Sequence, residues 1–486
     1  MNKKIYLQPF IYSALLCVGL VIGFLIPKNA SNKFTEVLDI VNRDYVDSVG
    51  DDLEYQMVSK YLSSLDPHSV YIPAKYYKYA QESLRGNYEG IGIEFGMVDT
   101  QVYVMRVVMD GPAYKAGLKT GDQILMADGV SFQTTDISYK TVVESLKGFA
   151  NEVLVLKIKK RDNSIKLYEI TRESVANSSI RAAFVYKNKG YINFSRFSNN
   201  SHQEFLKSLK ELKEIGFETL VVDLRGNGGG FLKEAQKIVN EFLEKDQLIA
   251  YIKGRNRKKD YFYADGEGIY KTGELVLLID NNTASASEIL SGALQDHDRA
   301  KIIGKSSYGK GLVQETYYFK DSSTMKLTVS RYYLPTGRSI QRNYQSLTDS
   351  LNSDTFYTLV KKRKMIDGNG VHPDIEYPMD LNDSLEDAIW YVLKNNQTDK
   401  FVLRDYKKVE YKSPKEFIDR FTVQMDKVKT LLGEIQRTDH INLPVSNPKF
   451  IQRIQEELRN KIAYNYYGTE FFHYCEVHSE NWIDLL

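Results

Sequence analysis

Cysteine is scarce in this sequence, and there is no excess of charge of either sign. Only two cysteines, Cys17 and Cys475, occur among 486 residues, so we expect no disulfide framework, and cysteine usage does not indicate the cellular compartment. The 65 basic and 63 acidic residues leave a formal net charge of +2, which gives no reason to expect nucleic acid as a partner. A hydrophobic fraction of 42% and a charged fraction of 26% are typical of a folded protein and exclude wholesale disorder.

Long apolar runs are also scarce, and the prominent one lies near the N-terminus. Phe10–Ile26 is almost entirely apolar and follows Lys3 and Lys4. Its length is at the lower limit for a membrane-spanning helix and the upper limit for a signal-peptide core, but no small-x-small cleavage site follows, because Lys28 occupies a position that needs a small residue. Residues 1–28 are therefore predicted to be an uncleaved anchor rather than a cleaved signal peptide or a buried helix. The basic flank should stay cytoplasmic, which sends the remainder to the extracytoplasmic (periplasmic) side of the cytoplasmic membrane.

The pattern of apolar residues changes along the chain and predicts a multidomain α/β (α+β) protein. Short β runs follow Gly86, interrupted by helical pieces near Ala113–Ala116 and Tyr139–Leu146. From Ala183 strands and helices alternate, which indicates an α/β core, and the strands cease after about Met379. The predicted regions are the N-terminal segment 1–28, a helical region 29–86, a β domain 87–173, an α/β core 174–380 and a helical region 381–486.

The β domain carries two linked motifs. Gly90-Ile91-Gly92-Ile93 is a glycine loop that opens a strand, and its backbone amides could bind a terminal carboxylate while the peptide pairs as an added strand. Alone, this loop would more often be an ordinary packed strand. The stretch Asp110–Asp122 adds the helix-then-turn form of a PDZ domain, and together the two motifs resemble that family over residues 87–173. The resemblance implies a pocket for an apolar C-terminal side chain, lined by Ile91, Ile93 and the helix Tyr139–Leu146.

A glycine-rich turn, Asp223–Gly230, follows an apolar strand in the α/β core and precedes a helix. Backbone amides exposed by such a turn could stabilise a developing oxyanion. A phosphate-binding loop relies on the same physics. This turn lacks the Gly-Lys-Ser/Thr ending of such loops, and no dinucleotide fingerprint is present, so nucleotide binding is not expected.

A serine among small residues and a lysine between two glycines are the strongest chemical signal. Ser285 lies in Asn282-Thr-Ala-Ser-Ala-Ser-Glu288, and Lys310 lies between Gly309 and Gly311. A lysine that loses water on entering a tight site has a lowered pKa, and its neutral amine can then accept a serine proton. Ser287 is the alternative nucleophile, although a structural or helix-capping role suits it better.

These segments resemble the carboxyl-terminal processing (tail-specific) serine peptidases, as do Leu65–Ser69, Leu327–Gly337 and Gly370–Asp374. The resemblance extends over about residues 31–380, with the PDZ domain in its usual place. It implies a crotonase-like serine peptidase core with an inserted PDZ β domain and helical N- and C-terminal regions. It further implies an endopeptidase that needs no metal or organic cofactor and acts on proteins or peptides with apolar C-termini.

The same resemblance implies individual roles. Ser285 corresponds to the nucleophile, Lys310 to the general base and Gln314 to the residue that orients the base. The amides of Gly229 and Ala286 correspond to the oxyanion hole. Many relatives carry proline where this chain has Gly228, which leaves the choice of oxyanion glycine within Gly228–Gly230 open.

Other interpretations compete with this one. His297, next to Asp296 and Asp298, could belong to a Ser-His-Asp triad, although Asp296 more simply supports the fold. Plausible zinc ligands at His473, Cys475 and His478 match no familiar spacing, so no metal site is predicted. A non-catalytic PDZ scaffold or chaperone that binds unfolded C-termini is the alternative function, and a lipid- or acyl-binding relative of the core fold is a third. Helical segments at both ends could support a homodimer.

Overall fold

In the computed structural model the chain consists of two compact units, Met1–Tyr71 and Ile72–Leu486. The predicted anchor Phe10–Ile26 lies outside the described residues, as does most of the polar stretch Arg342–Ser353, which the sequence predicts to be an exposed loop. Within the part of the chain that is described, no helix is long and apolar enough to cross a membrane. The structure describes residues 33–47, 52–74, 76–77, 86–342, 355–377, 383–407 and 409–485.

The described residues of the first unit are mainly helical, as the sequence predicts for region 29–86. It contains α2 (Lys33–Asp44) and α3 (Asp52–Ser63), and β1 (Val70–Ile72) begins at its end. None of the residues of α2 is buried, and Phe34, Val37 and Ile40 leave an apolar stripe exposed along it.

A PDZ-like β domain begins the second unit. The sheet order is β3-β4-β5-β7-β8, all antiparallel, with β6 paired to β5, and β2 pairs separately with β9. The two predicted helices are present, and Ser138 caps the second by accepting from the Thr141 N–H at 3.1 Å. The elements are β2 (Asn87–Gly90), β3 (Ile93–Val98), β4 (Gln101–Val107), α5 (Pro112–Lys115), β5 (Gln123–Ala127), β6 (Val130–Ser131), α6 (Tyr139–Leu146), β7 (Val153–Lys159), β8 (Ile165–Thr171) and β9 (Glu173–Ala176).

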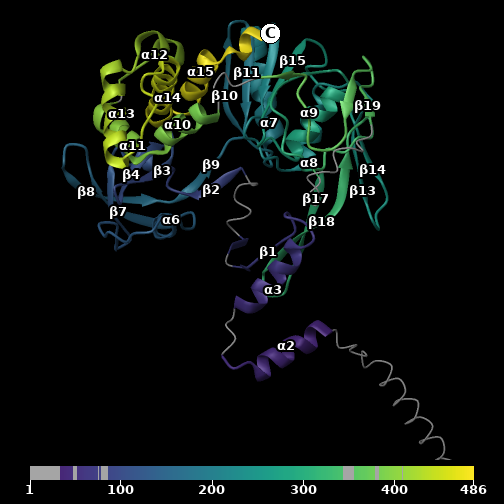
Figure 1. The fold of residues 1–486 in the computed structure, drawn as a ribbon, viewed down its shortest axis with the longest axis horizontal. Helices are drawn as coiled ribbons and strands as arrows, with labels where there is room; N and C mark the ends of the chain where they lie inside the picture. Colours follow the sequence, from purple (N-terminus) through teal and green to yellow (C-terminus); the bar gives the residue numbers. More distant parts are fainter. Residues whose placement is uncertain are drawn as a thin grey trace, which may run out of the picture. The chain divides into compact units, whose positions relative to one another are not determined.

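The α/β core is built on a sheet with the order β10-β11-β12-β15-β16-β21, parallel from β11 onward. Strands β10, β11 and β15 of this sheet and helices α7, α8 and α9 are labelled in Figure 1. Every residue of the central strand β12 is buried, because both faces of the sheet are covered. The elements are β10 (Ile180–Tyr186), β11 (Lys189–Phe194), α7 (Ser201–Ile215), β12 (Thr219–Asp223), α8 (Leu232–Asn240), β15 (Glu274–Ile279), α9 (Ala286–Asp296), β16 (Lys301–Gly304) and β21 (Ile375–Glu376).

A second, antiparallel sheet packs beside this core. Tyr332 and Leu334 on or next to its long strand β18 join the core cluster that also holds Ile289 and Leu290 of α9. A separate short hairpin pairs β19 with β20. The elements are β13 (Leu248–Gly254), β14 (Asp260–Tyr263), β17 (Leu312–Tyr318), β18 (Thr324–Tyr333), β19 (Thr355–Tyr357) and β20 (Lys364–Ile366).

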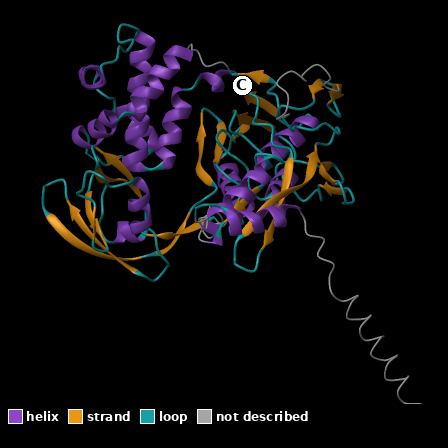
Figure 2. Cartoon of the chain, turned by 60° about the horizontal axis from the view of Figure 1, so that its bottom comes forward, coloured by secondary structure: helices purple, strands orange, loops and turns teal. Residues whose placement is uncertain are grey.

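The C-terminal region is helical, as predicted, and its helices are among those coloured purple in Figure 2. It has its own apolar core. Ser413 caps the start of α12, since its hydroxyl accepts from the Glu416 N–H at 3.2 Å. The carboxylate of Glu416 accepts from the Lys412 N–H. The elements are α10 (Asp383–Lys394), α11 (Asn396–Asp405), α12 (Pro414–Arg420), α13 (Met425–Asp439), α14 (Pro448–Tyr467), α15 (Thr469–Ser479) and the 3₁₀ helix η2 (Asn481–Leu485).

The end of this region covers one face of the core sheet. Val477, Trp482 and Ile483 form one apolar cluster with side chains of β10, β11, β12, β15 and β16. Helices α7, α8 and α9 contribute to the larger apolar core that the same strands build with their other side chains. The core sheet is therefore sandwiched between helices and the C-terminal segment.

Candidate active site

Ser285 stands at the sharp turn that connects β15 to α9. Its backbone has φ 59° and ψ −115°, outside the regions that non-glycine residues normally adopt. Such strain persists only where surrounding structure enforces it, and it is concentrated at functional sites. All eleven residues of α9, beginning with Ala286, are buried. Ser285 itself is half-buried, so a rigid helix presents its side chain at an accessible edge.

The lysine segment reaches the same place from the loop between β16 and β17. Gly309 has φ +90°, and a methyl group added there would lie 3.0 Å from Arg342 Cβ and 3.2 Å from the Gly370 nitrogen. Only glycine fits this position without strain. Lys310 is half-buried, and its carbonyl accepts a hydrogen bond from the Tyr332 hydroxyl. Gln314 lies further along, on β17, with Nε2 3.4 Å from Thr328 Oγ1 on the paired strand.

The buried carboxylate of Glu288 joins the serine and lysine segments. Its Oε2 accepts from the backbone N–H groups of Ser285 at 2.7 Å and Lys310 at 2.8 Å. Its Oε1 accepts from the Gly309 N–H at 2.7 Å and the Ser307 hydroxyl at 2.5 Å. Burial raises the pKa of Glu288, although these hydrogen bonds oppose the shift. Sequence reasoning assigned Glu288 no role; its place three residues into α9 was the only local signal.

The glycine turn lies against the serine segment through Asn227. The Asn227 carbonyl accepts from the Ala284 N–H at 3.0 Å and from the Ser287 hydroxyl at 2.9 Å. Thr283 Oγ1 donates to the Leu224 carbonyl at 2.9 Å. Ser287 is therefore engaged in holding the turn, in keeping with the structural role expected of it.

Gly229 packs closely against the serine. It has φ +97°, and an added methyl group would lie 2.8 Å from Ser285 Cβ and 3.0 Å from the Ala286 nitrogen. The Gly229 N–H donates to Asn227 Oδ1 at 2.9 Å, so it has a partner within the turn. Ala286 is the first residue of α9, where backbone N–H groups have no partner within the helix.

His297 is engaged elsewhere. Its Nε2 lies 2.7 Å from the Leu248 carbonyl oxygen on β13, to which it donates. That nitrogen therefore carries the proton and is not free to act as a base. Asp296 accepts from Arg338 Nε at 2.9 Å and from Thr336 Oγ1 at 2.7 Å, and the side chains of Asp296 and Arg338 are completely buried. Asp296 thus supports the fold, as the sequence indicated.

His473, Cys475 and His478 near the C-terminus do not form a cluster of metal ligands. His473 Nδ1 lies 2.7 Å from Glu476 Oε2, and His478 Nδ1 lies 3.0 Å from the Tyr186 hydroxyl. Cys475 is buried in the helical core, and burial raises its pKa to about 12. Across the described residues, no group of three or more His, Cys, Asp or Glu side chains could hold a metal ion.

The predicted carboxylate loop lies at the start of β3. Gly90 ends β2, where it pairs with Glu173, and Ile93 begins β3. The Ile91 carbonyl accepts from the Ala113 N–H at 2.8 Å, and the Ile91 side chain, only 3% exposed, packs in the core of this domain rather than lining an open pocket.

Within the described residues of this sheet, β3 is an outer strand with one edge unpaired. Helix α6 lies nearby, because the ring of Tyr139 stacks on that of Phe95 with centroids 5.0 Å apart. A free strand edge beside a helix is the geometry to which a peptide can add as a further strand.

Comparison with known proteins relates these features to two families. Residues 90–169 match the PDZ domain model, and residues 188–377 match the model of peptidase family S41. The carboxy-terminal processing protease CtpB of Bacillus subtilis is 32% identical over 338 residues, which cover 68% of this chain and 69% of that protein. A carboxyl-terminal-processing protease of Picosynechococcus sp. is 31% identical over 299 residues, 60% of this chain and 71% of that protein.

Among solved structures, a photosystem II D1 C-terminal processing protease is 25% identical and covers 71% of this chain and 86% of its own, with a TM-score of 0.40. The resemblance inferred from the sequence is thus confirmed by the family and sequence matches. The chain belongs to peptidase family S41, as a PDZ-containing serine-type peptidase related to the carboxy-terminal processing proteases.

Proposed function

We propose that the chain is a serine endopeptidase with Ser285 as nucleophile, Lys310 as general base and Gln314 as the residue that orients the base. The observation that carries this proposal is the Glu288 carboxylate, which accepts from the backbone N–H groups of both Ser285 and Lys310 through one oxygen. A buried acceptor shared in this way fixes the two segments relative to each other, which is what proton transfer between their side chains requires.

In the proposed reaction the neutral amine of Lys310 takes the proton of the Ser285 hydroxyl as the oxygen attacks a peptide carbonyl carbon. The backbone N–H groups of Gly229 and Ala286 stabilise the negative oxygen that forms. Collapse of this intermediate breaks the C–N bond, and Lys310 returns the proton to the departing amine. Water then attacks the acyl-enzyme carbonyl while Lys310 takes the water proton. Collapse of this second intermediate breaks the bond between the acyl carbon and Ser285 Oγ, and Lys310 returns the proton to that oxygen. No step calls on a metal or an organic cofactor.

The proposed oxyanion role of Gly229 requires one rearrangement. Its N–H donates to Asn227 Oδ1 at 2.9 Å, so this bond must be exchanged for one to the substrate oxygen. Ala286, at the first position of α9, needs no such change, because helix N-termini leave these donors available.

We further propose that the PDZ domain binds the free C-terminus of a substrate at Gly90, Ile91, Gly92 and Ile93. The unpaired edge of β3 would take the peptide as an added strand, and an apolar terminal side chain would lie between β3 and α6. Domains that capture a chain end near a peptidase centre raise the local concentration of that chain. The extracytoplasmic location and the membrane anchor remain proposals that rest on the apolar run Phe10–Ile26 and its basic flank.

A homodimer is also proposed, with α2 as the surface of contact. Val37 and Ile40 are 46% and 45% exposed on this helix, apolar side chains of the kind that pack against another helix. Sedimentation of the wild-type protein and of a variant with Val37→Glu and Ile40→Glu would test this, because a monomeric wild type would exclude it.

The catalytic proposal is tested by incubating the protein with a peptide that ends in apolar residues and following products by mass spectrometry. Wild-type protein should cleave the peptide, whereas Ser285→Ala and Lys310→Ala should not, with circular dichroism unchanged. Cleavage that survives Lys310→Ala would refute the assignment of the base. Binding of the peptide without cleavage by wild-type protein would instead support the scaffold or chaperone alternative.

A further inference from the structure

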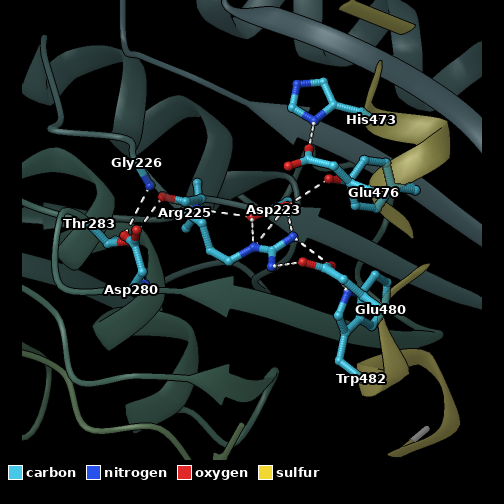
Figure 3. A network of polar contacts seen from close by, with 11 residues as sticks. Asp223, Arg225, Gly226, Asp280, Thr283, His473, Glu476, Glu480 and Trp482 are labelled. Atoms are coloured by element: carbon cyan, nitrogen blue, oxygen red, sulfur yellow. Dashed lines mark hydrogen bonds and ion pairs between the residues drawn. The ribbon is translucent and has the colours of Figure 1, made fainter. Parts of the chain in front are cut away.

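The arginine of the glycine turn is held between two carboxylates from distant parts of the chain (Figure 3). Arg225 Nε lies 2.9 Å from Asp223 Oδ1, and Nη2 lies 2.7 Å from Asp223 Oδ2. On its other side, Nη1 lies 2.7 Å from Glu480 Oε1 and Nη2 lies 3.0 Å from Glu480 Oε2. Arg225 therefore makes a two-pronged contact with each carboxylate, the geometry in which guanidinium pairs are strongest.

Glu480 comes from the C-terminal helical region, which lies beyond the residues that match either family. Trp482 Nε1 donates to the Glu480 carboxylate. The Trp482 ring is 1% exposed and stacks on Tyr191 with centroids 6.2 Å apart. Tyr191 in turn donates its hydroxyl to Asp223 Oδ2 at 2.7 Å. The C-terminal segment and the glycine turn are thus joined by a closed network of polar and ring contacts.

The side chains of this network are largely buried, and its arginine stays charged. The side chains of Asp223, Glu480 and Arg225 are 2%, 16% and 26% exposed. Burial alone would lower the pKa of Arg225, but the charges of Asp223 and Glu480 outweigh it and raise this pKa well above its usual value. Arg225 therefore stays charged at any pH at which the protein would be assayed. Its paired contacts with Asp223 and Glu480, called the clamp from here on, are not broken by titration of Arg225.

The residues that follow Arg225 contact the segment that carries Ser285. The Gly226 N–H donates to Asp280 Oδ1 at 2.9 Å, which fixes the beginning of the turn (Figure 3). Asn227 then bonds to the segment before Ser285, and Gly229 approaches Ser285 so closely that no Cβ would fit. A displacement of Arg225 would therefore be passed to Gly229 through only a few peptide units.

We propose that Glu480 is a positioning residue for the peptidase centre, and that it acts through Arg225 to fix the turn that carries Asn227 and Gly229 against Ser285. The inference rests on the proposed function, because the turn affects the chemistry only if Ser285 and Gly229 act as described. Under this proposal, region 381–486 contributes to the reaction in addition to covering the apolar face of the core sheet.

Replacement of Glu480 distinguishes a role in positioning the turn from a purely structural role. Arg225 would keep its contact with Asp223, so no uncompensated charge would be left buried, and the fold should survive. A residue that only joined two parts of the protein would lower the melting temperature when replaced, without a specific loss of kcat. A positioning residue should lower kcat while KM stays nearly unchanged, because substrate binding does not depend on it.

The first experiment compares Glu480→Gln with Asp399→Asn. Asp399 forms an ion pair with Lys461 at 2.7 Å in the same helical region, without contact to the glycine turn, and so provides a matched control. We expect Glu480→Gln to lower kcat roughly tenfold or more, since small misplacements of a catalytic group have effects of this size. KM should change less than about twofold, and Asp399→Asn should leave kcat within about twofold of wild type. Equal kcat values in the two variants would overturn the proposal.

The second experiment needs no catalysis. Backbone hydrogen exchange of a peptide covering residues 224–231 is measured by mass spectrometry in a Ser285→Ala background, with and without Glu480→Gln. We expect faster exchange in this peptide with Glu480→Gln and no change with Asp399→Asn.

Fluorescence provides a third measurement. The chain has two tryptophans, so in a Trp390→Phe variant the emission comes from Trp482 and reports directly on the clamp. Glu480→Gln should shift this emission.

These outcomes are distinguishable from failure of the proposed function. If the wild-type protein cleaves no peptide in a Ser285-dependent way, the peptidase assignment fails, and exchange alone decides whether Glu480 holds the turn. Unchanged exchange in residues 224–231 would overturn the proposal whatever the activity. Faster exchange with an unchanged kcat would also overturn it, because Glu480 would then hold the turn without affecting the reaction.

Discussion

The Glu288 carboxylate accepts a hydrogen bond from the backbone N–H of Ser285 at 2.7 Å. The same oxygen accepts from Lys310, so one buried side chain in the first turn of α9 determines how the two segments lie relative to each other. A buried carboxylate with four donors is fully satisfied, and such networks rigidify a site. Loss of any of these donors, or of the negative charge of Glu288, should therefore displace both Ser285 and Lys310.

Replacement of Glu288 by glutamine should reduce activity strongly. The amide nitrogen of Glu288→Gln would face N–H donors where an acceptor is needed, which pushes the two segments apart. We expect kcat to fall about 100-fold with a small change in KM, measured with a cleavable peptide. Glu234→Gln is the control, because Glu234 is also buried, at 5% exposure, but accepts from the His202 N–H on α7. A loss of kcat of the same size in both variants would contradict this explanation.

Stability should depend on pH through Glu288. Burial raises its folded pKa above the ordinary value of 4.5, so the folded protein binds a proton that the unfolded chain releases between the two values. Lowering the pH from neutral toward 4.5 should therefore stabilise wild-type protein relative to Glu288→Gln. The measurement is the difference in melting temperature between the two proteins across this window. A difference that moves against wild-type protein as the pH falls would show that the pKa of Glu288 is lowered instead.

Two neighbouring glycines should respond differently to the same substitution. Gly229→Ala would place a methyl group 2.7 Å from the Ala284 oxygen and 2.8 Å from Ser285 Cβ, at φ +97°. We expect at least a 100-fold loss of kcat, since the turn or the serine must shift. Gly228→Ala would meet no atom within 4 Å, so activity should remain within about twofold of wild type. Equal sensitivity at the two positions would argue against close packing of the turn on Ser285.

Replacement of His297 should cost stability and leave the chemistry intact. His297→Ala removes the bond from Nε2 to the Leu248 carbonyl and should lower the free energy of unfolding by about 1 kcal/mol. The kcat value of this variant should match that of wild-type protein under conditions where both are folded. Loss of activity in His297→Ala, with activity retained in Lys310→Ala, would reinstate a histidine base.

Asp296 should be required for folding. Asp296→Ala would leave the guanidinium of Arg338 buried without its carboxylate, and both side chains are 0% exposed. Breaking such a pair typically lowers the free energy of unfolding by about 3–5 kcal/mol, as urea denaturation would measure. Asp419→Asn removes an exposed pair with Lys415 and should leave the denaturation midpoint unchanged. A midpoint equally unaffected in Asp296→Ala would disprove the structural role.

The sequence indicated which segments form the candidate site. It indicated less well which contacts hold those segments in place. Ser285, Lys310 and the turn Asp223–Gly230 could be identified because small residues and glycines marked them and because a family resemblance gave them roles. Glu288 could not be assigned, since its partners Ser307, Gly309 and Lys310 come near it only after α9 packs against the loop that follows β16.

Two further features escaped prediction for related reasons. A glycine turn read from sequence has free amides, but the Gly229 amide is engaged by the Asn227 side chain, a bond that depends on the rotamer of Asn227. Glu480 and Arg225 are 255 residues apart, and no local pattern around either residue indicates the other. The helical character of the C-terminal region was predictable because the strand pattern ends after about Met379, whereas its contact with the core sheet was not.

The long separation between Arg225 and Glu480 has a consequence for synthesis of the chain. Ribosomes extend proteins at roughly 5–20 residues per second, so about 10 to 50 seconds pass between the emergence of these two residues. During that interval the face of the sheet lacks the cover that Trp482 and Ile483 later provide. If Glu480 positions the turn as proposed, nascent molecules have reduced peptidase activity until Glu480 has been synthesised, which limits premature cleavage of neighbouring polypeptides.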